Sequence, residues 1–168
     1  MKNHIETENT SLTTETGERS PVWGAILYQD FAGSISELSA LTKYFYQHLI
    51  LKKDYPDLAE DLMHISVSEM RHLKLLGELI TSFGCDPKFR SIERCAENYW
   101  SADCLNYSRN LRYLLMENIK GEQKAIAAYR LHLCQIKNAA AQNVLQHIIS
   151  EELQHIAVFQ RWLEAFPN

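Results

Sequence analysis

Two short stretches, Ser68-Glu69-Met70-Arg71-His72 and Glu151-Glu152-Leu153-Gln154-His155, each hold a glutamate that is followed three residues later by a histidine. Residues three apart lie on one face of an α-helix, roughly one turn from each other. A carboxylate and an imidazole placed in this way can bind a metal ion together. A single Glu-x-x-His arises often by chance, whereas two copies inside apolar helical stripes indicate a shared metal site.

The residues around the two stretches repeat along the chain. Leu62-x-His64-Ile65-x-x-x-Glu69-x-x-His72 aligns without a gap with Leu145-x-His147-Ile148-x-x-x-Glu152-x-x-His155, at an offset of 83. At an offset of 85, Glu37-x-x-x-Leu41-x-x-Tyr44 aligns with Glu122-x-x-x-Ile126-x-x-Tyr129. The chain therefore reads as two similar helical hairpins, related by an approximate two-fold axis.

Long apolar stripes at helical spacing predict an all-α protein, because only six glycines and four prolines interrupt the chain. We expect one helix from Ser20-Pro21 to about residue 51, a second that ends at Gly84, a third over about 108–134 and a fourth that Asn138 caps. Residues 85–107 lack sustained periodicity, and a short helix over about 92–99 is one reading. Their length fits a crossover between the ends of a four-helix bundle.

Length, charge and cysteine spacing limit the classes of protein to which the chain could belong. The 168 residues suggest a disordered tail over 1–19 and a single bundle domain over 20–168. The sequence has no apolar run long enough to predict a membrane span. A net charge of -4 argues against nucleic-acid binding. The four cysteines form no Cys-x-x-Cys pair, which favours unpaired thiols and a cytoplasmic location.

Four glutamates and two histidines fall inside the apolar stripes of the four predicted helices. They are Glu37, Glu69, His72, Glu122, Glu152 and His155. Four ionised carboxylates cannot remain in a dry core without cations, because each unpaired buried charge costs several kcal/mol. Two divalent ions would cancel the four charges. Mixed carboxylate and imidazole ligands favour iron or manganese, with zinc as a further possibility.

This pattern, over about residues 21–165, resembles the ferritin-like dimetal-carboxylate bundles, and the Gly121-Glu122 pair resembles the rubrerythrin branch in particular. The resemblance implies that Glu37 and His72 hold one metal and that Glu122 and His155 hold the other. Glu69 and Glu152 would bridge both. The sequence departs from rubrerythrins in lacking a rubredoxin-like Cys-x-x-Cys module. It also carries Ala125 where those proteins usually have another carboxylate.

Three further residues are candidates for supporting the metal ligands from a second layer. Tyr44 and Tyr129 lie two turns after Glu37 and Glu122, where they would either hydrogen-bond to the site, relay a radical or simply pack in the core. Asp30 could orient a ligand histidine. Glu151 lies next to Glu152 but falls outside the stripe and has no partner in the repeat, so we favour Glu152 as the ligand.

The sequence supports three functional hypotheses. The first is a dinuclear oxidoreductase acting on hydrogen peroxide or dioxygen, as a peroxidase, a catalase or an oxidase, with an external electron donor where the reaction needs one. The second is iron oxidation and storage, and the third is a binding module whose metals only staple the helices. We expect a homodimer, which is the commonest assembly.

Overall fold

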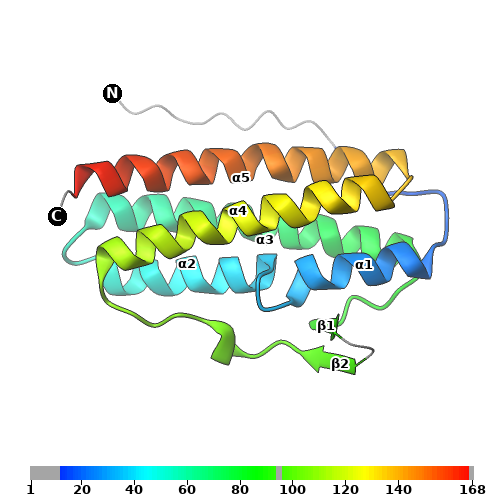
Figure 1. Cartoon of the computed structure of the whole chain (residues 1–168), viewed down its shortest axis with the longest axis horizontal. Helices are drawn as coiled ribbons and strands as arrows, with labels where there is room; N and C mark the ends of the chain where they lie inside the picture. Colours follow the sequence, from blue (N-terminus) through cyan, green and yellow to red (C-terminus); the bar gives the residue numbers. More distant parts are fainter. Residues whose placement is uncertain (1–11, 94–95, 167–168) are drawn as a thin grey trace.

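The computed structural model describes residues 12–93 and 96–166. Within them the chain forms a four-helix bundle, as expected, in which α1 and α2 together make one arm (Figure 1). The helices are α1 (Pro21–Ala32), α2 (Glu37–Leu51), α3 (Pro56–Ser82), α4 (Leu111–Gln135) and α5 (Ala139–Ala165). Between α3 and α4 lie β1 (Arg90–Glu93), β2 (Ala96–Tyr99) and the 3₁₀ turn η1 (Ala102–Cys104).

The bundle consists of two antiparallel helical hairpins. The α2 helix packs along α3, and α4 packs along α5. The segment between α3 and α4 runs the length of the bundle, so these two helices point the same way (Figure 1). This arrangement confirms the predicted pair of hairpins joined by a long crossover.

The first arm is two helices and not the single helix that the apolar stripe predicted. The chain bends over residues 33–36, where α1 ends at Gly33 and Ser36 starts α2. The Ser36 side chain accepts a hydrogen bond from the Ser39 backbone, and the Ser39 hydroxyl donates to the Gly33 carbonyl at 2.9 Å. These bonds satisfy backbone groups that a continuous helix would have paired internally. The break makes Glu37 the first residue of α2.

The crossover contains a β-hairpin where a short helix was one reading of the sequence. Its strands pair antiparallel, with Arg90 opposite Tyr99 and Ile92 opposite Glu97. The Arg90 guanidinium pairs with Glu97 and lies over the ring of Tyr28 on α1, 4.9 Å from its centroid. The contact with Tyr28 fastens the hairpin to the first arm, whereas the pair with Glu97 joins the two strands of the hairpin.

The other helix ends follow the sequence more closely. Asn110 and Asn138 cap α4 and α5, each accepting a hydrogen bond from a backbone N–H three residues later. Gly84 adopts a φ of 84° just after α3, the left-handed conformation that commonly ends a helix. The predicted N-cap Asn138 and the predicted stop at Gly84 are confirmed.

Part of the predicted N-terminal tail contacts the bundle. The Thr16 backbone N–H donates to Ser82 Oγ at 2.9 Å, and Asn138 Nδ2 donates to the Thr16 carbonyl at 3.0 Å. Residues 12–19 thus tie the ends of α3 and α5 together, which differs from the disorder expected for this stretch. The rest of the expected tail, residues 1–11, lies outside the described residues.

Two apolar clusters fill the bundle on either side of a polar layer. One includes Leu76, Leu79 and Ile148, and the other includes Leu62 and Phe159. Along α3 and α5 the two Glu-x-x-His pairs fall between these clusters. In the described part of the chain, Cys85, Cys104 and Cys134 are free thiols, and none of the helices has the length and apolar character to cross a membrane. Cys95 lies outside that part.

Candidate metal centre

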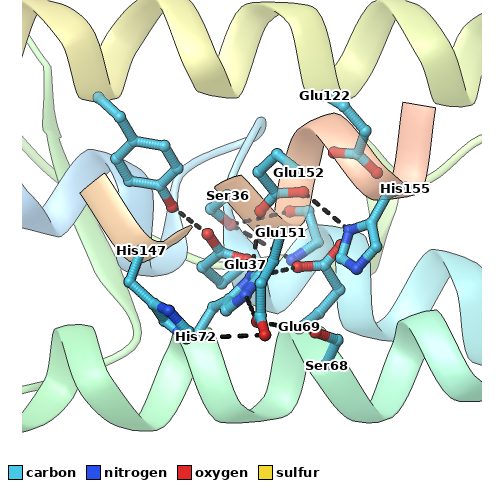
Figure 2. A network of polar contacts seen from close by, with 12 residues as sticks. Ser36, Glu37, Ser68, Glu69, His72, Glu122, His147, Glu151, Glu152 and His155 are labelled. Carbon is cyan, nitrogen blue, oxygen red and sulfur yellow. Dashed lines mark hydrogen bonds and ion pairs between the residues drawn. The ribbon is translucent and has the colours of Figure 1, made fainter. Parts of the chain in front are cut away.

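The six side chains predicted as metal ligands meet inside the bundle (Figure 2). All four rods of the bundle contribute side chains. Glu37 lies on α2, Glu122 lies on α4, and the Glu-x-x-His pairs lie on α3 and α5. Each of the six is at most 6% exposed. The helical repeat explains this convergence, since equivalent positions in the two hairpins face each other across the approximate two-fold axis.

The two histidines point the same ring nitrogen, Nδ1, into the cluster. His72 Nδ1 lies 2.9 Å from Glu69 Oε2 and 3.1 Å from Glu152 Oε1. His155 Nδ1 lies 2.9 Å from Glu152 Oε2 and 3.2 Å from Glu69 Oε1. Glu69 and Glu152 therefore each direct one oxygen to one imidazole and the second oxygen to the other.

The other two carboxylates each belong to one histidine only. Glu37 Oε2 lies 3.5 Å from His72 Nδ1. Two sets of donor atoms result, one of Glu37, Glu69, His72 and Glu152, the other of Glu69, Glu122, Glu152 and His155, and within each set the atoms lie within 4.8 Å of one another. The structure thus brings together the two donor sets that the resemblance implied, with Glu69 and Glu152 common to both.

The chemistry of this cluster fits a pair of divalent cations. Glu69 Oε1 is buried and makes no well-aligned hydrogen bond among the described residues, and its ion-pair contact is His155 Nδ1 at 3.2 Å. A cation would satisfy this oxygen better. Four buried carboxylates can supply the negative charge that two divalent ions require. Oxygen and imidazole nitrogen donors of this kind suit iron and manganese.

Without metal, protons must balance the charge of the cluster. Burial raises the pKa of Glu122 to about 8, helped by the nearby charges of Glu152 and Glu69, and burial together with the same two carboxylates raises the pKa of Glu37. Burial alone would lower the pKa of His155, but its bonds to Glu152 and Glu69 outweigh this effect and raise it to about 10. Metal binding would displace these protons.

Two tyrosines donate hydrogen bonds to the carboxylates of Glu37 and Glu122, each from the opposite hairpin. The Tyr44 hydroxyl on α2 donates to Glu122 Oε1 on α4, and the Tyr129 hydroxyl on α4 donates to Glu37 Oε1 on α2. Both rings are at most 1% exposed. Burial and the neighbouring carboxylates raise the pKa of each phenol, so both stay neutral donors. Of the three roles left open for the tyrosines, the structure shows a hydrogen bond to the cluster, from Tyr44 to Glu122 and from Tyr129 to Glu37.

Glu151, which the sequence pattern does not favour as a ligand, contacts one of the two histidines of the cluster. Its Oε2 lies 2.7 Å from Nε2 of His72, the ring nitrogen that faces away from the cluster. The hydrogen bond to His72 holds the pKa of Glu151 down at about 2. Glu151 lies outside the apolar stripe, which argued against a role at the cluster. The feature that could have pointed to this contact is its position next to Glu152, at the rim of the same helix face.

Asp30 does not support a ligand histidine, which corrects the expectation for this residue. Its Oδ2 lies 2.6 Å from Nδ1 of His132, which is outside both donor sets. Asp30 is buried on α1 and pairs with His132 on α4, before the bend that separates α1 from Glu37.

A cavity of about 160 Å³ leads to the cluster between the α1–α2 bend and α4. The buried carboxylates of Glu37, Glu122 and Glu152 line it together with the exposed lysines Lys120 and Lys124. Because its lining includes both the cluster and the surface, the cavity connects the two. Its volume has room for water-sized molecules.

The bundle and its buried carboxylates and imidazoles define a ferritin-like protein with a candidate dimetal centre. Residues 32–163 match the family model named Rubrerythrin, and the chain belongs to this family. A comparison with curated protein sequences gives no match.

Solved structures share the fold. KatB, a manganese catalase from Anabaena, superposes with a TM-score of 0.84 and 23% identity, over 100% of this chain and 85% of that one. A bacterioferritin from Desulfovibrio desulfuricans superposes with a TM-score of 0.72 and 22% identity, over 84% of this chain and 78% of that one. A bacterioferritin from Mycobacterium tuberculosis superposes with a TM-score of 0.73 and 18% identity, over 88% of this chain and 87% of that one. These likenesses establish the ferritin-like bundle.

Proposed function

We propose that the protein is a dinuclear metal oxidoreductase whose substrate is a small oxidant, hydrogen peroxide or dioxygen. The observation that carries the proposal is the placement of Glu69 and Glu152, each of which directs one oxygen to each of the two imidazoles. A carboxylate so placed can hold two ions at once. Structural zinc sites, in contrast, are usually built from cysteine and histidine.

Disproportionation of hydrogen peroxide is the reaction that we favour. Two molecules of peroxide give two of water and one of dioxygen, so this reaction needs no other reductant. The likeness to a manganese catalase, over the whole of this chain, supports it. When bound, a pair of iron or manganese ions would supply the two-electron redox chemistry that the protein's own side chains lack.

The residues of this chain would have distinct tasks. Glu37 with His72, and Glu122 with His155, would each hold one ion, and Glu69 and Glu152 would hold both. The hydroxyls of Tyr44 and Tyr129 would fix the rotamers of Glu122 and Glu37. The cavity lined by Glu37, Glu122 and Glu152 would give peroxide a path to the ions.

Peroxide turnover by the metal-loaded protein tests this function. Full-length protein is loaded with Mn²⁺ or Fe²⁺, and hydrogen peroxide loss and dioxygen release are followed together. We expect turnover in the wild type and in Glu78→Gln, a charge-matched control on the exposed side of α3. We expect none in Glu69→Gln. If neither metal gives turnover, with or without an added reductant, the proposed activity is wrong.

Iron oxidation and storage is the second candidate, because two bacterioferritins share the fold. Storage needs a hollow shell of many subunits, whereas the oxidoreductase needs only a small assembly. Size-exclusion chromatography with light scattering separates the two. A homodimer, which we expect, excludes storage, and a particle of a dozen or more subunits that retains added iron would favour it.

A further inference from the structure

We propose that Glu151 makes the two metal positions unequal, so that the position formed by Glu37 and His72 binds its ion more tightly than the one formed by Glu122 and His155. The inference rests on the proposed dimetal centre and goes beyond it. It concerns the order in which the positions fill, which the approximate two-fold symmetry alone would leave undecided.

The first support is the set of contacts around Glu151. One of its oxygens, Oε2, accepts the hydrogen of His72 Nε2 at 2.7 Å and also the hydroxyl of Ser68 at 3.2 Å. Its other oxygen lies 3.6 Å from Nε2 of His147. Figure 2 shows Glu151 held among these three side chains, on the side of His72 that faces away from the cluster.

The second support is the sequence repeat, which does not supply an equivalent carboxylate to His155. Glu151 precedes Glu152, and the residue that precedes Glu69 in the other hairpin is Ser68. The Ser68 hydroxyl is turned to Glu151. Among the described residues, the ion pairs of His155 all involve Nδ1, and no carboxylate pairs with its Nε2.

A carboxylate behind a ligand histidine strengthens that ligand in two ways. It keeps the ring hydrogen on Nε2, so the lone pair of Nδ1 points to the metal, and it makes the imidazole a better donor. Removing such a partner typically weakens metal binding by about 10- to 100-fold. His72 has this support and His155 does not, and the two positions should therefore differ by a factor of this order.

Single-position variants of the full-length protein measure each affinity separately. His155→Ala leaves the His72 position intact, and His72→Ala leaves the His155 position intact. Calorimetric titration with Mn²⁺ alone gives the affinity of each. We expect His155→Ala to bind one Mn²⁺ about 10- to 100-fold more tightly than His72→Ala.

Adding Glu151→Gln to each variant identifies the cause. The substitution should weaken Mn²⁺ binding about 10- to 100-fold in His155→Ala and leave it within about 3-fold in His72→Ala. Glu78→Gln serves as the charge-matched control and should change neither. Circular dichroism shows whether each variant folds, and a further pair with Glu151→Asp shows whether a shorter carboxylate restores part of the affinity.

The outcomes separate this inference from the proposed activity. Equal affinities in the two single-position variants would overturn it, as would equal weakening of both by Glu151→Gln. Absence of Mn²⁺ binding in the wild type would overturn both the inference and the dimetal centre. Unequal binding without peroxide turnover would support the inference and reject only the activity.

Discussion

Tyr44 on α2 donates its hydroxyl hydrogen to Glu122 on α4, so a phenol of the first hairpin holds a carboxylate of the second. Tyr129 and Glu37 form the reciprocal bond. These two bonds link the hairpins at the level of the candidate centre, where apolar packing is interrupted by charged groups. The same two bonds therefore contribute to the stability of the bundle and hold the carboxylates of Glu37 and Glu122 in place.

Tyr44→Phe and Tyr129→Phe should therefore destabilise the metal-free protein. Each change leaves a buried carboxyl oxygen without its donor, which costs about 1–3 kcal/mol. Urea unfolding in the presence of a chelator measures the loss. Tyr113→Phe, at an exposed tyrosine on α4, is the matched control and should change the free energy of unfolding by less than about 0.5 kcal/mol. Equal effects at Tyr44 and Tyr113 would contradict the assigned bond.

Glu37→Gln should separate metal binding from folding. Burial and the nearby Glu69 and Glu152 raise the pKa of Glu37, so its carboxyl tends to be neutral without metal, and a neutral amide can still accept from Tyr129. The metal-free unfolding free energy should change by less than about 1 kcal/mol. Stabilisation by added Mn²⁺ should fall markedly, because one ligand is lost. A variant that keeps the full Mn²⁺-induced rise in Tm would exclude Glu37 as a ligand.

The metal-free protein should lose stability as the pH rises above neutral. The pKa of His155 in the folded protein is about 10, above the 6.5 of an ordinary histidine, so its contribution is complete below about pH 6.5 and is lost towards pH 10. The pKa of Glu122 is raised from 4.5 to about 8 in the folded protein, so its contribution to stability is lost as the pH rises between these two values. Thermal unfolding with a chelator at pH 6 to 9 measures this trend.

Metal should reverse this dependence on pH. Binding requires neutral imidazoles and ionised carboxylates, so it should release up to about four protons, from His72, His155, Glu37 and Glu122. Titration with Mn²⁺ in buffers of different ionisation enthalpy counts them. Metal affinity that does not change with pH, with no proton release, would show that the ions bind elsewhere.

Gly121→Ala should be tolerated and informative. Glycine within a helix costs roughly 1 kcal/mol relative to alanine, and the added methyl group would lie 3.3 Å from Nζ of Lys43, the flexible end of a side chain on α2. Lys43 can move by a few tenths of an ångström, so the free energy of unfolding should rise by up to about 1 kcal/mol. Urea unfolding measures it, and a loss above 1 kcal/mol would mean that Lys43 cannot move.

Most of the bundle and of the donor set could be predicted from the sequence because both follow from regular spacing. The Glu-x-x-His pairs, their repeat and the glutamates inside apolar stripes place six side chains on inward faces. The break over residues 33–36 was missed because the apolar stripe continues through it. Its sign was local, a Gly-Ser pair followed by Ser36, which caps α2.

Contacts made across the bundle could not be read from spacing within one helix. Glu151 lies outside the stripe of α5, yet it reaches Nε2 of His72 on α3. Asp30 on α1 pairs with His132 on α4, a contact between two helices that spacing along one helix does not reveal. The β-hairpin depends on pairing between two short strands and on Arg90 reaching α1, neither of which leaves a periodic signal.

Anomalous diffraction from crystals of the Mn²⁺-loaded protein tests the dimetal centre most directly. The account predicts two manganese peaks per chain inside the bundle, separated by about 3.5–4 Å, with Glu69 and Glu152 in contact with both. One peak should lie beside Nδ1 of His72 and the other beside Nδ1 of His155. Manganese found only at the protein surface, or Glu69 and Glu152 turned away from the ions, would contradict it.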